Sequence, residues 1–130
     1  MKNNDMNTIG KGESSYDAEN DILIFKIKNR DYFKSIEFDD DNLTVEIDHD
    51  GVIMGFSFFD ASQTLGLNKS VINTIKQFSF VAKVDGKKLF IRLKFEAYKN
   101  PKSLVNYSQD FIREITDLNI INSNVECSAQ

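Results

Sequence analysis

The stretch that begins at Glu46 has the spacing of a known metal site. Glu46, Asp48 and Asp50 occupy the first, third and fifth positions of a calcium loop of the EF-hand type, and Gly51 occupies the sixth. However, the twelfth position, where that loop needs a bidentate glutamate, is Ser57. Both flanks also alternate like strands, and alternation alone would place Glu46 and Asp48 on one solvent face. We therefore interpret the stretch as a hairpin, and we expect neither a metal nor a cofactor.

The other reactive side chains are too scattered to build a familiar site. The run Asp39–Asp41 has the charge for magnesium, but adjacent polar turn-formers are more typical of a solvated break between strands. His49 is the single histidine and Cys127 the single cysteine, which excludes histidine and thiolate metal clusters. Gly66 and Gly86 are isolated, so neither begins a glycine-rich phosphate loop. We predict no catalytic, cofactor-binding or metal-binding residues.

The basic hairpin over 78–96 is the best candidate for ligand binding. Its outward face is expected to carry four cations and one aromatic ring: Lys83, Lys88, Phe90, Arg92 and Lys94. Cationic sheets with exposed aromatic rings bind single-stranded nucleic acid by phosphate contact and base stacking. One phenylalanine makes a small stacking platform, and the isoelectric point of about 5.0 is acidic. Polyanion binding is therefore an alternative function.

Charge is distributed unevenly along the chain, whose net charge is -4. Residues 13–60 contain 13 acidic and 4 basic side chains, whereas residues 76–102 contain 8 basic and 2 acidic ones. This asymmetry indicates complementary surfaces within or between subunits, or a basic face for a polyanion. Two solvated sheet faces of different charge would produce the same pattern.

Hydrophobic alternation and turn residues predict the elements that would position these groups. Strands are expected over 22–28, 32–38, 43–48, 52–59, 78–84 and 89–95. Two tight hairpin turns are expected, at His49-Asp50-Gly51 and at Asp85-Gly86. Short helices are expected from Asn68 or Ser70 to about Gln77, and over about 109–118 after a capping Ser108.

These elements predict an α+β fold, an antiparallel β-meander of about six strands with helices on one face. We expect a disordered arm over 1–15, a single domain over 16–121 and a polar tail over 122–130. The amino terminus is polar throughout, and no apolar run approaches the roughly 20 residues needed to span a bilayer. The single cysteine suits a reducing compartment, so we expect a cytoplasmic protein.

The stretch from Tyr16 to about Leu65 resembles a small prokaryotic family, the domain of unknown function 2283. The resemblance lies in Asp21-Ile22-Leu23-Ile24, in the run from Asp48 to Phe56, and in the exit Asp60-Ala61-Ser62. The remainder of the chain is a carboxy-terminal extension outside the family pattern. The resemblance implies a fold and no catalytic residues. Because such domains are often encoded beside candidate toxin genes, it also implies a regulatory or antitoxin-like role.

Together these features favour a binding or oligomerisation module that acts through protein–protein contacts. We expect it to form a homodimer and not to bind a membrane. The stretch Val52–Phe59 is apolar on both faces, which is typical of a strand covered from both sides. Two alternatives stay open. One is single-stranded nucleic-acid binding through the hairpin 78–96. The other is a small enzyme with a carboxylate-based site that gathers Asp60 and Ser62 with the second half of the chain.

Overall fold

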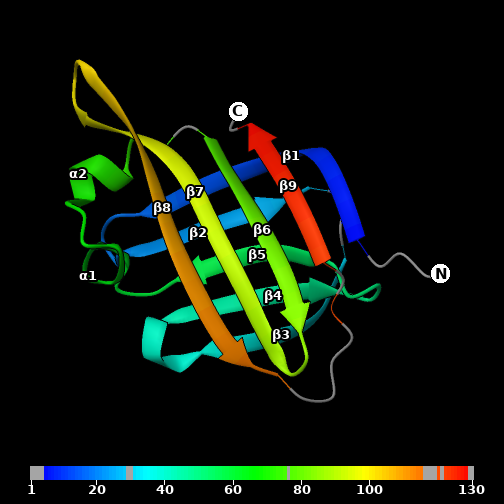
Figure 1. The fold of residues 1–130 in the computed structure, drawn as a ribbon. Coiled ribbons are helices and arrows are strands. Elements are labelled where there is room, and N and C mark those ends of the chain that lie inside the picture. Colours follow the sequence, from blue (N-terminus) through cyan, green and yellow to red (C-terminus); the bar gives the residue numbers. More distant parts are fainter. Residues whose placement is uncertain (1–4, 29–30, 76, 116–119, 121, 129–130) are drawn as a thin grey trace.

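The computed structural model describes residues 5–28, 31–75, 77–115, 120 and 122–128. These residues are mostly β-structure (Figure 1). The strands are β1 (Asp5–Asp17), β2 (Ile22–Ile27), β3 (Tyr32–Phe38), β4 (Leu43–Asp48), β5 (Ile53–Phe58), β6 (Gln77–Asp85), β7 (Lys88–Asn100), β8 (Ser103–Glu114) and β9 (Asn122–Ser128). The helical elements are a 3-10 turn η1 (Asp39–Asp41) and two short helices, α1 (Ala61–Leu65) and α2 (Lys69–Ile72).

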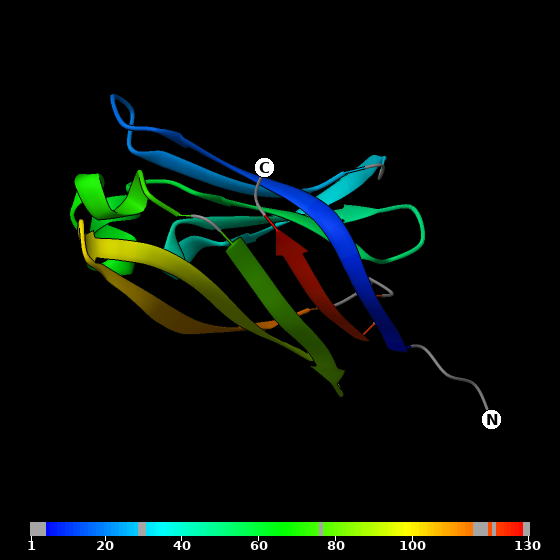
Figure 2. The same ribbon diagram turned by 90° about the horizontal axis from the view of Figure 1, so that it is seen from above.

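The strands form one continuous sheet that folds into two layers. Their order is β3-β4-β5-β2-β1-β9-β6-β7-β8. The long strand β1 belongs to both layers: its carboxy-terminal half pairs with β2 and its amino-terminal half with β9. Figure 2 shows β1 passing from one layer to the other. Neighbouring strands are antiparallel except β1 and β9, which are parallel.

The core lies between the two layers and is rich in phenylalanine. Phe25 of β2 is fully buried, and its ring centroid lies 4.7 Å from that of Phe78 in β6. Phe56 of β5 meets Phe80 of β6 edge to face, with centroids 4.9 Å apart. Each buried phenylalanine contributes roughly 1.5–3 kcal/mol by leaving water. These contacts hold the layers face to face.

The predicted α+β fold with helices on one face is wrong, because a second β layer covers that face instead. The helices α1 and α2 have only five and four residues. Within the described part of the chain, no helix is long and apolar enough to cross a membrane. The helix from Asn68 begins where expected, but it ends at Ile72, and by Gln77 the chain has entered β6.

The predicted helix over 109–118 is also wrong, because 103–114 is strand β8. Phe111, Ile112 and Ile115 have helical spacing, which suggested one apolar stripe. In the structure Phe111 is buried, whereas Ile112 is 57% exposed on the opposite face. Pairing with the thirteen-residue strand β7 overrides the local pattern. Residues 116–118 of the predicted helix lie outside the described residues.

Both predicted hairpins are confirmed. Gly51 has φ 86° and Gly86 has φ 62°, conformations that glycine adopts without steric cost. The second turn lies one residue later than predicted. Asp85 pairs with Lys88, so the two loop residues are Gly86 and Lys87.

Much of the expected arm over 1–15 and of the expected tail over 122–130 lies in the sheet, as β1 (Asp5–Asp17) and β9 (Asn122–Ser128), whereas residues 1–4 and 129–130 lie outside the described residues. Strands β1 and β9 run parallel, with Asp5 opposite Asn122 and Lys11 opposite Ser128. These strands are mostly polar, so their residues do not show the apolar alternation that indicates a strand. Backbone hydrogen bonds can hold them in a ladder without it. The expected domain boundary at residue 16 therefore falls inside β1.

The packing between the layers predicts which phenylalanine matters for stability. Phe25→Ala should lower the free energy of unfolding by about 3–5 kcal/mol, because the cavity lies among three other rings. The matched control is Phe33→Ala, since Phe33 is 48% exposed, and about 1 kcal/mol or less is expected there. Urea unfolding measures both values, and equal losses would contradict the two-layer core.

Candidate functional site

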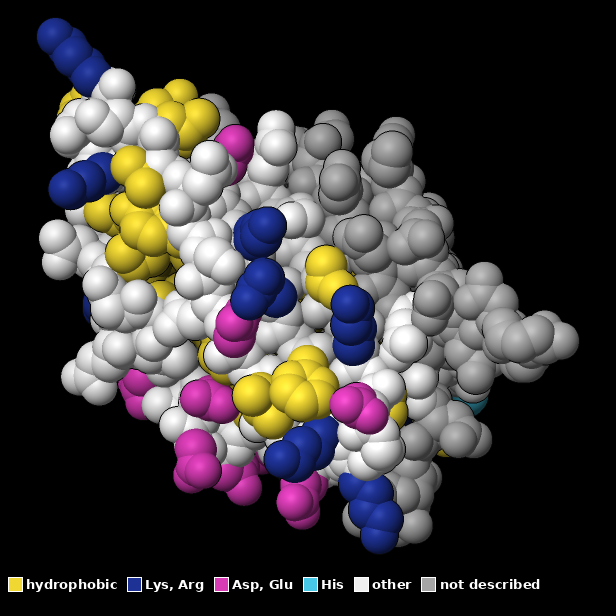
Figure 3. All heavy atoms as spheres, viewed as in Figure 1, with side chains coloured by type: hydrophobic (Ala, Val, Ile, Leu, Met, Phe, Trp, Pro, Cys, Tyr) yellow, Lys and Arg dark blue, Asp and Glu magenta, His cyan; other side chains and the backbone are white. Residues whose placement is uncertain are grey.

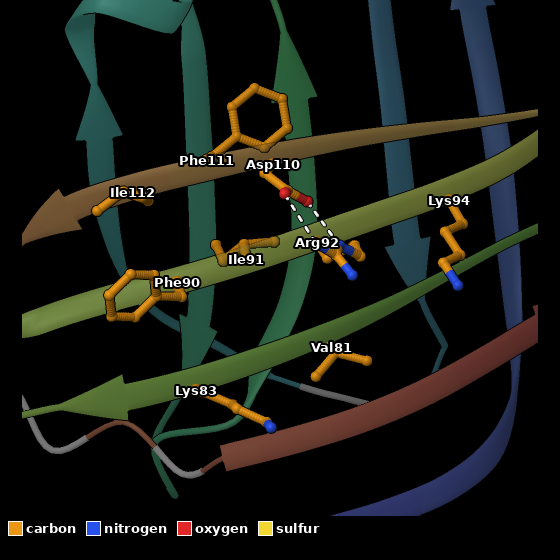
Figure 4. A pocket seen from close by; sticks show the side chains of 9 residues that line it. All are labelled: Val81, Lys83, Phe90, Ile91, Arg92, Lys94, Asp110, Phe111 and Ile112. Carbon is orange, nitrogen blue, oxygen red and sulfur yellow. Dashed lines mark hydrogen bonds and ion pairs between the residues drawn. The ribbon is translucent and has the colours of Figure 1, made fainter.

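The outward face of the second layer carries the only predicted ligand-binding residues. A shallow depression of about 500 Å³ lies on this face, and Figure 4 shows its lining: Val81, Lys83, Phe90, Ile91, Arg92, Lys94, Asp110, Phe111 and Ile112. Four of the five predicted residues line it, whereas Lys88 does not. We call the outward side chains of β6, β7 and β8 the front face. The contribution of β8 was not predicted, because its second half lies in the segment 109–118 that was predicted as a helix.

An ion pair crosses the depression. The Arg92 Nε donates to Asp110 Oδ1 at 2.8 Å, and its Nη2 donates to Asp110 Oδ2 at 3.0 Å. The hydrogen bonds from Arg92 lower the pKa of Asp110, and those to Asp110 raise the pKa of Arg92. Both side chains are more than half exposed, so the pair adds little stability. Its main effect is to occupy the guanidinium fork that would otherwise bind a phosphate.

Strand pairing also surrounds Lys88 with acidic groups. The register places Lys88 directly opposite Asp85 of β6 on one side and opposite Glu114 of β8 on the other. Directly opposed residues in an antiparallel ladder have their Cβ atoms about 4.5–5.5 Å apart, close enough for opposite charges to interact. The register therefore places a carboxylate-bearing residue on each side of Lys88.

The front face is consequently close to neutral. Its four cations, Lys83, Lys88, Arg92 and Lys94, share the face with four carboxylates, Asp85, Glu96, Asp110 and Glu114. Figure 3 shows basic and acidic side chains mixed around an apolar group. This arrangement does not produce the strongly positive strip that binding a phosphate backbone would need.

The centre of the front face is apolar. Phe90 is 36% exposed and Ile112 is 57% exposed, and the register places them opposite each other on β7 and β8. Lys83 lies opposite Phe90 on its other side, from β6. Exposed apolar side chains surrounded by charged ones are typical of protein-binding surfaces.

A second polar cluster joins the turn between β1 and β2 to helix α1. The Asp21 carboxylate accepts hydrogen bonds from the Tyr16 hydroxyl at 2.6 Å, from the Ser62 hydroxyl at 2.6 Å and from the Ser62 N–H at 3.0 Å. Asp21 itself has φ 58°, an unusual backbone conformation that this cluster holds in place. We call these three residues the Asp21 clamp.

The Asp21 clamp has opposite effects on its two acidic groups. Burial alone would raise the pKa of Asp21, but the hydrogen bonds from Ser62 and Tyr16 outweigh it and lower the pKa. Burial and the neighbouring Asp21 raise the pKa of Tyr16 to about 12. A carboxylate with a lowered pKa is a poor general base, so it does little to activate the Ser62 hydroxyl.

The structure therefore gathers Ser62 with residues of the first half, rather than with the second half as the enzyme alternative required. Asp60 is exposed and has φ 50° just before α1. From the second half of the chain, Gln109 Nε2 donates a long hydrogen bond of 3.4 Å to the carbonyl of Thr64 in α1. These positions favour a structural role for Asp60 and Ser62.

The calcium-like stretch also has a structural explanation. Asp48 is buried, and its Oδ1 accepts hydrogen bonds from the N–H groups of Asp50 at 2.9 Å and Val52 at 3.0 Å. The prediction that Asp48 shares an open solvent face with Glu46 is therefore wrong. The carboxylate turns back onto the hairpin loop because the loop N–H groups need an acceptor.

The remaining candidates lie apart from one another. Asp39–Asp41 form the turn η1, where burial and the charge of Asp40 raise the pKa of Asp41. His49 is exposed and its ring lies 4.5 Å from that of Phe33. Cys127 lies in β9, and its side chain is outside the described part. The described residues contain no group of three or more histidine, cysteine, aspartate or glutamate side chains arranged for a metal ion.

Two comparisons with known proteins give a match. Residues 14–62 match a family described as Protein of unknown function (DUF2283). A protein of Methanosarcina mazei, provisionally named a hypoxanthine phosphoribosyltransferase, is 32% identical over 87 residues, which cover 67% of this chain and 69% of that protein. No solved structure matches the chain at a significant level.

The Asp21 clamp predicts an acid-dependent contribution to stability. Asp21→Asn should lower the free energy of unfolding by about 1–3 kcal/mol at neutral pH, because a charged acceptor of three hydrogen bonds is lost. The folded pKa of Asp21 is lowered, so this advantage of the natural protein is complete above the unfolded pKa of about 3.9. It disappears as the pH falls through the folded pKa.

Urea unfolding of both proteins between neutral and strongly acidic pH measures this difference. Glu19→Gln is the matched control, since Glu19 is an exposed acidic residue in the same turn and lies outside the clamp. A pH-independent gap between the natural protein and Asp21→Asn would rule out the clamp as the origin of the effect.

Proposed function

The chain belongs to the family described as Protein of unknown function (DUF2283), and we propose that it is a cytoplasmic binding module that self-associates through protein–protein contacts. The observation that carries this proposal is the composition of the front face. Phe90 and Ile112 form an exposed apolar centre, and charged residues of both signs surround it. Protein interfaces have this arrangement of an apolar core and a polar rim.

A second copy of the chain is the partner that the front face favours. Charged residues of both signs surround its apolar centre, so the same face of a second copy can present the opposite charge to them. Complementary charges of this kind attract two copies in preferred orientations, which raises the rate of encounter. A regulatory or antitoxin-like role would use the same front face for a different protein, and it stays a prediction.

Single-stranded nucleic-acid binding has weaker support. The Asp110 carboxylate occupies the Arg92 guanidinium, and Asp85 and Glu114 lie opposite Lys88. Phe90 is the single aromatic ring in the lining of the depression that is exposed enough for a base to stack on it.

Catalysis has weaker support as well. Phosphoribosyl transfer, the activity in the name of the M. mazei relative, requires phosphate binding, for which helix amino termini after glycine-rich loops are the usual device. In this chain the N–H of Ser62 at the start of α1 already donates to the Asp21 carboxylate. The described helices have only four or five residues, too short for such a phosphate site. We therefore propose no transferase activity.

Self-association predicts a molar mass of about twice 14.9 kDa in light scattering at high protein concentration and low salt. Ile112→Lys should shift the mass toward the monomer, because it places a charge in the apolar centre of the interface. Phe33→Lys is the matched control: Phe33 is similarly exposed but lies on β3 of the other layer, so no shift is expected. A monomer mass for the natural protein at every concentration would exclude the proposal.

Nucleic-acid binding has its own test on the same surface. Fluorescence anisotropy with a labelled single-stranded oligonucleotide should give no salt-sensitive binding up to micromolar protein. Binding that weakens with salt, and that Lys83→Glu and Lys94→Glu abolish, would instead establish the front face as a polyanion site.

A further inference from the structure

Strand β8 ends the sheet and presents an open edge. It is the last strand in the order, and within the described residues nothing pairs with the side that faces away from β7. Its twelve residues, Ser103–Glu114, make this edge unusually long. A long open edge exposes backbone donors and acceptors that another strand can satisfy.

The opposite edge of the sheet is protected, and β8 is not. Strand β3 has only seven residues, and its register is irregular between Tyr32 and Lys34. It also carries a lysine, Lys34, at the edge. Bulges, lysine and short length are the usual means of preventing edge pairing. Strand β8 contains neither proline nor lysine, and its pairing with β7 is regular from Leu104 to Glu114.

We propose that two copies of the chain join through β8, edge to edge and antiparallel, with the two-fold axis at Ser108. The second layers then form one continuous sheet across the dimer. This inference rests on the proposed self-association and specifies its interface. It follows from the self-complementary pattern of side chains along β8.

On the outward side, the axis at Ser108 pairs the exposed residues of β8 with suitable partners. Leu104 is 48% exposed, and it comes to lie opposite Ile112 of the second copy, itself 57% exposed. Asn106 comes to lie opposite Asp110 of the second copy. Apolar pairs directly opposite each other contribute roughly 0.2–1 kcal/mol each, and the symmetry produces two of them.

Neighbouring registers lack this match. An axis at Tyr107 would place Leu104 opposite Asp110 of the second copy, and an axis at Gln109 would place it opposite Glu114. Both arrangements set an exposed apolar side chain against a carboxylate. Because register in a sheet is set by the pattern of side chains on each face, the axis at Ser108 is favoured.

Charge supports the same axis at the two ends of the contact. Glu114, the last residue of β8, comes to lie next to the turn that precedes β8 in the second copy, where Lys102 supplies a positive charge, and the symmetry repeats this pair at the other end. The chain can extend this far because the β7–β8 hairpin projects beyond the body of the molecule (Figure 1). Arg113 stays available to its own subunit, where it donates to the carbonyl of Glu37.

The pairing also extends the apolar centre of the front face. Within one copy, Phe90 lies opposite Ile112, and Leu104 lies opposite Tyr98. Joining the edges creates a continuous row across the dimer, from Phe90 and Ile112 of one copy to Leu104 and Tyr98 of the other. An edge contact buries less surface than the roughly 1,200 Å² of a stable interface, so we expect a concentration-dependent dimer.

Cysteine cross-linking tests the position of the axis. In a Cys127→Ser background, Ser108→Cys places two thiols opposite each other at the axis, and mild oxidation should give a disulfide-linked dimer on a non-reducing gel. Asn106→Cys is the matched control on the same face of β8. In the dimer, the two cysteines of Asn106→Cys would lie four residues apart along the paired strands. At roughly 3.4 Å per residue this is about 14 Å, which is too far for a disulfide.

A mixture of two variants gives an independent measurement. Leu104→Cys and Ile112→Cys, each in the Cys127→Ser background, should not cross-link alone but should do so when mixed. If light scattering gives a dimer but neither Ser108→Cys nor the mixture cross-links faster than Asn106→Cys, the β8 interface is overturned and self-association stands. A monomer at every concentration would overturn both.

Discussion

The contact between two layers of phenylalanine side chains is the constraint on which the rest of this structure depends. Phe25, Phe56 and Phe58 of the first layer pack on rings of the second layer at centroid distances of 4.7–6.0 Å. Each layer alone would leave one apolar face in water, so neither layer is stable without the other. The inner faces are thereby committed to the core, and any binding must use the outer faces and the edges.

The Asp21 clamp adds a polar constraint at one end of this core. It connects Tyr16, at the end of β1, with Ser62, at the start of α1, through the carboxylate of Asp21. The residues of the family resemblance that looked most reactive are thus used to fix the chain where it leaves β5. The clamp explains why an Asp-Ala-Ser sequence belongs to the fold and need not belong to an active site.

The front face shows how strand pairing changes the meaning of a charged segment. Along the chain, Lys88, Arg92 and Lys94 form a basic strand. In the sheet, β8 brings Asp110 and Glu114 beside them, and the face becomes nearly neutral around Phe90 and Ile112. A surface of that kind is better suited to a protein than to a phosphate backbone, and its open edge favours pairing with a second copy.

The sequence by itself determined the inner strands and both hairpins, because a two-residue apolar period and a glycine with positive φ are local properties. It could not reveal the second layer, the polar strands β1 and β9, or β8. Phe111 and Ile112 are compatible with a helix until β7 pairs with them, and the ends of the chain have no apolar signal. Tertiary structure decided these points, because which residues face each other depends on hydrogen bonds between segments far apart in sequence.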